Sequence, residues 1–158
     1  MNPTKQAIVA VLLAAGCRPD CPSDLPLVVT MAGSTYDHDV IEDAASEWNW
    51  AAGVEVIAIV PSGGRVVVRA GDAEELCGAV GAVGCARRYG PLYHERCEVV
   101  MQEGLAPYHA AVAVLVHELG HCLGLGHDDE PDSIMSPAYS PHEVIMSHHV
   151  DHVLGCWE

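Results

Sequence analysis

Side chains that can bind a metal ion and activate water are concentrated in one short stretch of the chain. The stretch reads His117-Glu118-Leu119-Gly120-His121-Cys122-Leu123-Gly124-Leu125-Gly126-His127-Asp128. Residues four apart on a helix project from one face, so His117 and His121 can share one ion, with Glu118 beside them. Gly124 suits the left-handed turn that ends many helices, and such a turn can return His127 to the same ion. Three neutral imidazoles with one open coordination position are typical of catalytic zinc.

The extended pattern H-E-x-x-H-x-x-G-x-x-H, followed by a turn that contains methionine, resembles the metzincin metallopeptidases. Met135 follows His127 by eight residues, and the run Met-Ser-Pro-Ala-Tyr at 135–139 resembles the matrixin branch most closely. Asp128 departs from this resemblance, because matrixins usually have serine there and the snake-venom and disintegrin-type metzincins have aspartate. The alternative, a buried helix with satisfied core histidines, requires many positions to agree by accident.

The resemblance implies a role for each matching residue and one catalytic Zn²⁺. The His- and Asp-rich loops that hold a second zinc and calcium in matrixins are not recognisable in this sequence, so structural calcium is not expected. Glu118 would be the general base, and Met135 would form a hydrophobic floor under the site. Pro137 and Tyr139 would line the pocket for the residue after the scissile bond. The implied zinc ligands are His117, His121 and His127.

The resemblance also implies an α+β, metzincin-like fold: a twisted mixed sheet of four to five strands, a first helix, a buried active-site helix, a Met-turn and a C-terminal helix. Hydrophobic periodicity agrees with this order. The edge strand at 83–88 would pair with extended substrate through main-chain hydrogen bonds, although an ordinary protected sheet edge explains it equally well. We expect strands at 27–30, 54–60, 65–70, 85–89 and 96–101, and helices at 36–50, 106–123 and 142–154.

Composition limits the classes of partner. The 158 residues carry a net charge of −15, half are hydrophobic, and 18% are charged, which suits one globular domain. Such acidity disfavours nucleic acid, because phosphate binding needs a basic surface. The acidity also disfavours electrostatic binding to anionic lipid, so we expect the protein to meet a membrane only through its N-terminus. The metzincin resemblance implies a protein or peptide substrate, and we expect a monomer.

The N-terminal residues resemble an export signal. Lys5 precedes a short apolar run, and Leu-Ala-Ala-Gly before Cys17 resembles a bacterial lipobox, in which the cysteine is lipidated. This predicts a signal peptide at 1–16, a tether at 17–26 and a peptidase domain at 27–158, anchored by lipid in the cell envelope. The alternative is an ordinary secretory signal and a secreted protein.

Six further cysteines suggest disulfides in an exported domain, and six cysteines allow fifteen pairings. The hypothesis is that they pair as Cys77–Cys85, Cys97–Cys122 and Cys21–Cys156. Cys122 is disfavoured as a zinc ligand because it points about 100° away from His121 around the helix.

The last helix carries several histidines, of which His148 and His152 have four-residue spacing beside Asp151. A second metal site there lacks an evident third ligand, and a solvated polar face is the preferred interpretation.

Three functions fit these observations. The first is a zinc endopeptidase with Glu118 as base, and it is favoured because a structural site needs no base. The second is a non-catalytic, lipid-anchored binding module that keeps zinc as architecture. The third is a zinc hydrolase acting on an amide that is not a peptide.

Overall fold

The computed structural model describes residues 25–90, 96–138 and 143–155. Its strands form one mixed sheet in the order β2-β1-β3-β5-β4, in which β4 is antiparallel to β5 and the other pairs are parallel. The strands are β1 (Leu27–Thr30), β2 (Ile57–Val60), β3 (Val66–Gly71), β4 (Gly84–Tyr89) and β5 (Arg96–Gln102). The helices are α1 (His38–Ala52), α2 (Ala73–Cys77), α3 (Tyr108–Cys122) and α4 (Ser147–Gly155). The predicted α+β class with a mixed sheet is confirmed.

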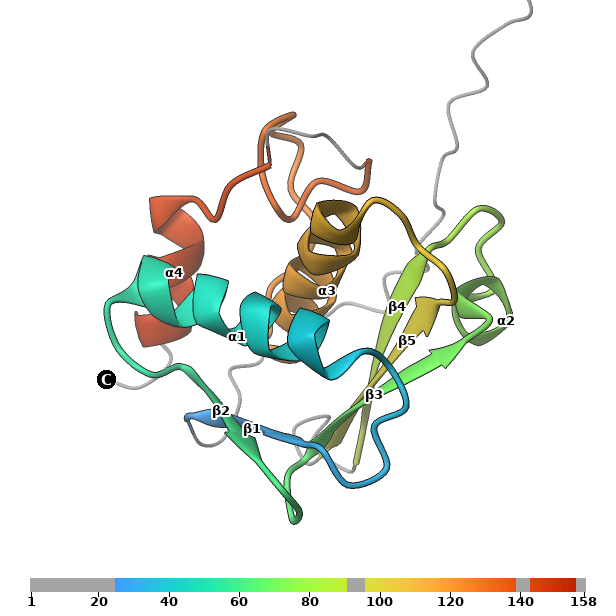
Figure 1. Cartoon of the computed structure of the whole chain (residues 1–158). Coiled ribbons are helices and arrows are strands. Elements are labelled where there is room, and N and C mark those ends of the chain that lie inside the picture. Colours follow the sequence, from blue (N-terminus) through green and yellow to red (C-terminus); the bar gives the residue numbers. More distant parts are fainter. Residues whose placement is uncertain (1–24, 91–95, 139–142, 156–158) are drawn as a thin grey trace, which may run out of the picture.

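The core lies between the sheet and two long helices, α1 and α3 (Figure 1). The Nε1–H of Trp48, a fully buried residue of α1, donates to the carbonyl oxygen of Val116 in α3 at 2.9 Å. The apolar residues on one side of α1 are all buried: Val40, Ile41, Ala44, Ala45 and Trp48. This packing fixes α3, the helix that carries the first two histidines of the motif.

Strand β4 borders the sheet on the side of α3, and among the described strands it pairs only with β5. Side chains alternate between the two faces of a strand. Gly84 therefore faces α3, where it lies against Glu118, while Cys85 faces the other way and is joined to Cys77 of α2. The expected edge strand is present, next to the active-site helix.

The predicted closing helix starts too early. Residues 139–142 lie outside the described residues, and α4 begins only at Ser147. The backbone of Val144 is engaged with the segment before Met135: its N–H donates to Asp132 O at 2.9 Å, and its carbonyl oxygen accepts from Ile134 N–H at 2.8 Å. Because the N–H and the carbonyl oxygen of Val144 both bond to another segment of the chain, they are not available for the hydrogen bonds of a helix.

Two of the three hypothesised disulfides are present, Cys77–Cys85 and Cys97–Cys122. The third, Cys21–Cys156, lies outside the described residues, as does Cys17. In the described part of the chain, every helix is too short or too polar to span a bilayer.

Candidate metal centre

The three histidines of the motif meet because α3 ends between the second and the third. Helix α3 stops at Cys122, and Gly124 takes the left-handed conformation at φ 96°. The N–H of Leu125 then donates to the carbonyl oxygen of Gly120 at 3.0 Å, which closes a Schellman-type end. The chain turns back at this point and brings His127 to the face that carries His117 and His121.

The Nε2 atoms of the three histidines form a nearly equilateral triangle. The separations are 3.0 Å between His117 and His121, 3.1 Å between His117 and His127, and 3.1 Å between His121 and His127. Nitrogens bound at ~2.0–2.1 Å to one tetrahedral ion are roughly 3.3 Å apart. The three nitrogen atoms therefore fit one ion.

The opposite ring nitrogens of the two helical histidines are held by backbone carbonyls. His117 Nδ1 donates to Ile134 O at 2.6 Å, and His121 Nδ1 donates to Leu125 O at 2.9 Å. A carbonyl oxygen only accepts, so each Nδ1 carries the proton and each Nε2 presents its lone pair. This is the tautomer that a zinc ligand needs, and these residues fit the ion.

The acid–base state of the histidines agrees with this role. Burial lowers the pKa of His117 to about 4, although the bond to Ile134 acts in the opposite direction. Burial, together with the neighbouring His117, lowers the pKa of His121 to about 3. Burial also lowers the pKa of His127. All three imidazoles are therefore neutral at physiological pH and available to bind a cation.

Glu118 is a buried carboxyl group between α3 and the edge strand, with an exposure of only 6%. Burial raises its pKa to about 8, and a hydrogen bond from the backbone N–H of Ala86 in β4 partly offsets this. Burying an acid is costly, and groups whose pKa is perturbed in this way concentrate at functional sites.

The segment around Met135 packs against the helix and the loop that carry the histidines. Met135 is fully buried and packs against Gly120, where a Cβ would come within 2.5 Å of its Sδ. The backbone N–H of Asp128 donates to Met135 O at 3.1 Å, and its Oδ2 accepts from Ser133 Oγ at 2.7 Å. Asp128 thus ties the loop after His127 to the Met-turn.

Of the two residues assigned to the substrate pocket, Pro137 is exposed at the surface after the Met-turn. Tyr139 lies outside the described residues.

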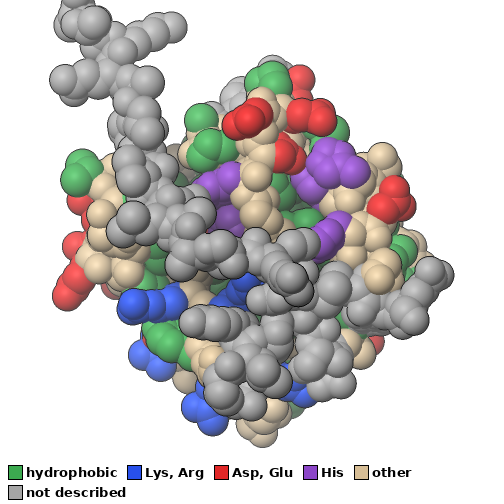
Figure 2. Space-filling view, turned by 180° about the vertical axis from the view of Figure 1, so that it is seen from behind, with side chains coloured by type: hydrophobic (Ala, Val, Ile, Leu, Met, Phe, Trp, Pro, Cys, Tyr) green, Lys and Arg blue, Asp and Glu red, His purple; other side chains and the backbone are tan. Residues whose placement is uncertain are grey.

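Charges are segregated around the site. Figure 2 shows histidine side chains together on one face, with acidic side chains above them and arginine side chains below. In the described parts of the chain, every Lys or Arg lies on or next to β3, β4 or β5: Arg65, Arg69, Arg87, Arg88 and Arg96.

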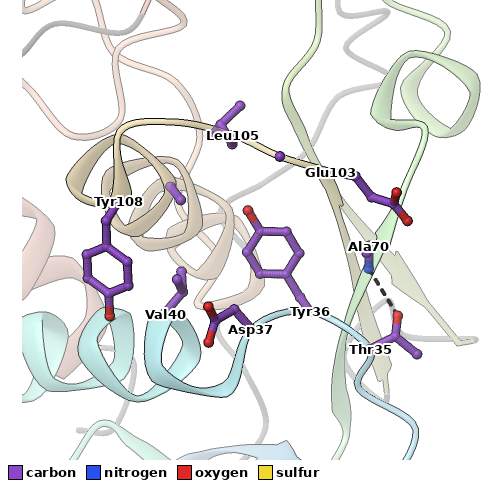
Figure 3. A pocket seen from close by; sticks show the side chains of 10 residues that line it. Thr35, Tyr36, Asp37, Val40, Ala70, Glu103, Leu105 and Tyr108 are labelled. Carbon is purple, nitrogen blue, oxygen red and sulfur yellow. Dashed lines mark hydrogen bonds between the residues drawn. The ribbon is translucent and has the colours of Figure 1, made fainter.

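A cavity of about 380 Å³ opens at the opposite end of α3, between the first turns of α1 and α3 (Figure 3). Tyr36, Asp37, Glu103 and Tyr108 are among its lining residues. Tyr108 starts α3 and lies nine residues before His117, which is roughly 13 Å along the helix axis. This cavity is therefore separate from the metal centre.

Sequence reasoning missed three residues around the site. Gly84 makes room for Glu118, Ser133 bonds to Asp128, and His149 of α4 donates to the same carboxylate at 2.8 Å. The solvated polar face expected for the last helix is wrong for His149, which is 3% exposed. The clustering of histidines in the last helix was the only sequence signal that pointed to His149. No local pattern in the sequence pointed to Gly84 or Ser133.

A helix that carries this three-histidine motif and packs on a mixed sheet is typical of zinc metallopeptidases. The sequence profile of the matrixins matches residues 30–156, most of the chain, and the chain therefore belongs to the matrixin family.

Individual relatives are similar only over a short stretch. Matrilysin of Felis catus is 61% identical over 28 residues, which are 18% of this chain and 11% of the relative. Matrix metalloproteinase-25 of Homo sapiens is 67% identical over 27 residues, 17% of this chain and 5% of the relative. The protein of that name from Mus musculus is 67% identical over 27 residues, 17% of this chain and 4% of the relative. These matches span a small fraction of the relatives' length.

Proposed function

We propose that this chain is a zinc-dependent endopeptidase in which His117, His121 and His127 hold one zinc ion and Glu118 is the general base. The observation that carries the proposal is the triangle of Nε2 atoms, 3.0–3.1 Å on each side, with a buried carboxyl group next to it. Zinc in such a site lowers the pKa of a bound water to about 7 and polarises the substrate carbonyl.

Glu118 would take a proton from the attacking water and pass it to the leaving amine. Burial raises the pKa of this group to about 8 in the protein alone. A cation held by the neighbouring histidines favours the carboxylate form, so Glu118 can accept a proton when the site is loaded. A site kept only as architecture has no use for a buried acid of this kind.

Extended peptide would bind along the outer edge of β4, a strand that packs one face against α3. Main-chain hydrogen bonds to an edge strand hold a peptide of almost any sequence, and side-chain pockets then select residues. Pro137 and Tyr139 are the proposed pocket residues, and Met135 is the proposed floor under the ion.

We also propose that the protein is exported, as a monomer, and held at the cell envelope by lipid on Cys17. The two disulfides of the described domain support an oxidising compartment. Mass spectrometry of the mature N-terminus tests this: a diacylglyceryl group on Cys17 supports the anchor, and an unmodified N-terminus contradicts it.

The enzyme proposal is tested by zinc analysis together with cleavage of a mixed peptide library, with and without a chelator. Glu118→Ala should keep one zinc per chain and lose turnover by about 10³-fold or more, because the base is removed and the ligands stay. His121→Ala should lose both zinc and turnover. Zinc binding without cleavage of any peptide would favour a non-catalytic module, and retained turnover in Glu118→Ala would exclude Glu118 as the base.

A further inference from the structure

A buried hydrogen-bond network joins α4 to the loop that carries the third histidine. His149 Nε2 lies 2.8 Å from Asp128 Oδ2 and 3.3 Å from Ser133 Oγ. The same carboxylate oxygen accepts from the Ser133 hydroxyl at 2.7 Å. Both His149 and Ser133 are buried, so water cannot readily replace these bonds.

The backbone determines which nitrogen of His149 carries the proton. The N–H of Met146, just before α4, donates to His149 Nδ1 at 3.1 Å. That nitrogen must therefore be the acceptor, which places the hydrogen of the neutral ring on Nε2. His149 Nε2–H consequently donates to Asp128, in a charge-assisted bond.

This tautomer also argues against a second metal ion. Asp128, His148 and His149 bring potential ligand atoms within 4.8 Å of one another. A metal ion on His149 Nε2 would need the lone pair of that atom, while Nδ1 already accepts a hydrogen bond. The geometry instead suits a donor that holds a carboxylate.

The network reaches two of the three histidines of the site. Asp128 directly follows His127, so fixing its side chain limits how that ligand can turn. Ser133 Oγ accepts from Met135 N–H at 3.0 Å, and the neighbouring carbonyl of Ile134 orients His117 Nδ1 at 2.6 Å. His149 thus supports both the loop after His127 and the turn that aims His117.

We propose that His149 is a positioning residue of the metal centre, which raises zinc affinity by holding Asp128 through its Nε2–H. The inference rests on the proposed zinc site. Partners that orient metal ligands through hydrogen bonds typically change metal affinity by about 10–100-fold when removed. Such partners usually bond directly to a metal ligand. His149 instead bonds to Asp128, the residue that follows the ligand His127.

Two substitutions separate the two ends of the imidazole. The amide of glutamine can place an N–H near the position of Nε2, whereas asparagine can place an acceptor near Nδ1 but is too short to reach Asp128. His149→Gln should therefore keep zinc affinity within about threefold of the parent. His149→Asn and His149→Ala should weaken zinc binding by about 10–100-fold.

Zinc affinity is measured by competition with a chromogenic chelator, and the thermal unfolding of each zinc-free protein reports the folding role separately. His148→Ala is the matched control. His148 contacts the same carboxylate oxygen at 3.4 Å but is more than half exposed, so its loss should change zinc affinity less than twofold.

Three outcomes are distinguishable. Weak zinc binding in His149→Asn with near-parental binding in His149→Gln supports the inference. Equal zinc affinity in all the variants, or equal loss in Gln and Asn, overturns it while leaving the zinc site intact. A parent protein that binds no zinc overturns the proposed function and the inference together.

Discussion

Gly84 in β4 lies directly against the carboxyl group of Glu118 in α3. A Cβ at position 84 would lie 2.7 Å from Glu118 Oε1, 2.9 Å from its Cγ and 2.6 Å from Val114 Cγ1. These separations are far below van der Waals contact, so any side chain must push the acid or the helix away. Strand β4 needs glycine at position 84 because the proposed catalytic base, Glu118, occupies the space that a side chain would fill.

The first prediction is that Gly84→Ala impairs turnover more than folding or zinc binding. A methyl group should displace Glu118 by several tenths of an ångström, and misplacement of a catalytic group costs up to about 100-fold in rate. We expect kcat to fall by about 10–100-fold with one zinc still bound. Steady-state kinetics and metal analysis check this. Gly155→Ala is the control, because a Cβ there meets nothing within 4 Å. Parental kcat in Gly84→Ala would contradict the spatial argument.

The second prediction concerns the zinc-free protein and pH. Burial raises the pKa of Glu118 from 4.5 to about 8, so the folded protein holds a proton there that the unfolded chain releases. The contribution of this group to stability is therefore present below about pH 4.5 and lost as pH rises to about 8.

Glutamine cannot ionise, so zinc-free Glu118→Gln should be more stable than the zinc-free parent at pH 8, by more than about 1 kcal/mol. The difference should shrink toward pH 5. Urea unfolding at both pH values, in the presence of a chelator, measures it. A pH-independent difference would mean that Glu118 is ionised to the same extent in the folded and unfolded states, so that burial does not raise its pKa.

Much of the site was predictable because its signals are local. The spacing of His117 and His121 follows from helix geometry, and the left-handed conformation of Gly124 follows from the need to end that helix. The buried face of α1 likewise follows from its 3.6-residue period. Each of these features depends on residues within one or two helical turns in the sequence.

The features that were missed depend on contacts between distant segments. The start of α4 was misplaced because the sequence Ser-Pro-His-Glu at 140–143 has the form of a helix-starting capping box, which is a local signal. The backbone of Val144 instead bonds to residues 132 and 134. His149 is buried and bonds to Asp128, 21 residues earlier in the sequence. The closeness of Gly84 to Glu118 depends on how the edge strand packs against α3, which no spacing within either segment reveals.

The third prediction concerns the disulfide between Cys97 and Cys122, which links β5 to the last residue of α3. The cross-link spans 25 residues. Closing a loop of that size lowers the entropy of the unfolded chain, which stabilises the folded state by about 3 kcal/mol. The double variant Cys97→Ala/Cys122→Ala should lose about that much stability.

The same double variant should also weaken zinc binding, because Cys122 follows His121 directly. Guanidinium unfolding and chelator competition measure the two effects. Cys77→Ala/Cys85→Ala is the comparison: its cross-link spans only 8 residues, so its entropic contribution should be smaller by roughly 1 kcal/mol. Parental stability in both double variants would show that the cross-links constrain the unfolded chain very little.

The fourth prediction concerns Gly120 and Met135, which pack against each other beside His121. A Cβ at position 120 would lie 2.5 Å from Met135 Sδ and 3.1 Å from Trp48 Cζ2. Gly120→Ala should therefore overpack the contact with Met135 and Trp48 and destabilise the fold by about 1–3 kcal/mol. Met135→Ala should leave a cavity and cost about 2–5 kcal/mol.

The two changes should compensate in the double variant. The methyl group added at position 120 enters part of the space that Met135 vacates, so the combined loss should be smaller than the sum of the single losses by at least about 1 kcal/mol. A double-mutant cycle, with the free energy of unfolding measured in the presence of a chelator, isolates this coupling from metal binding. Simple additivity would mean that backbone shifts, rather than the Met135 side chain, absorb the extra methyl group. The packing of methionine against glycine would then not explain why this chain has glycine at position 120.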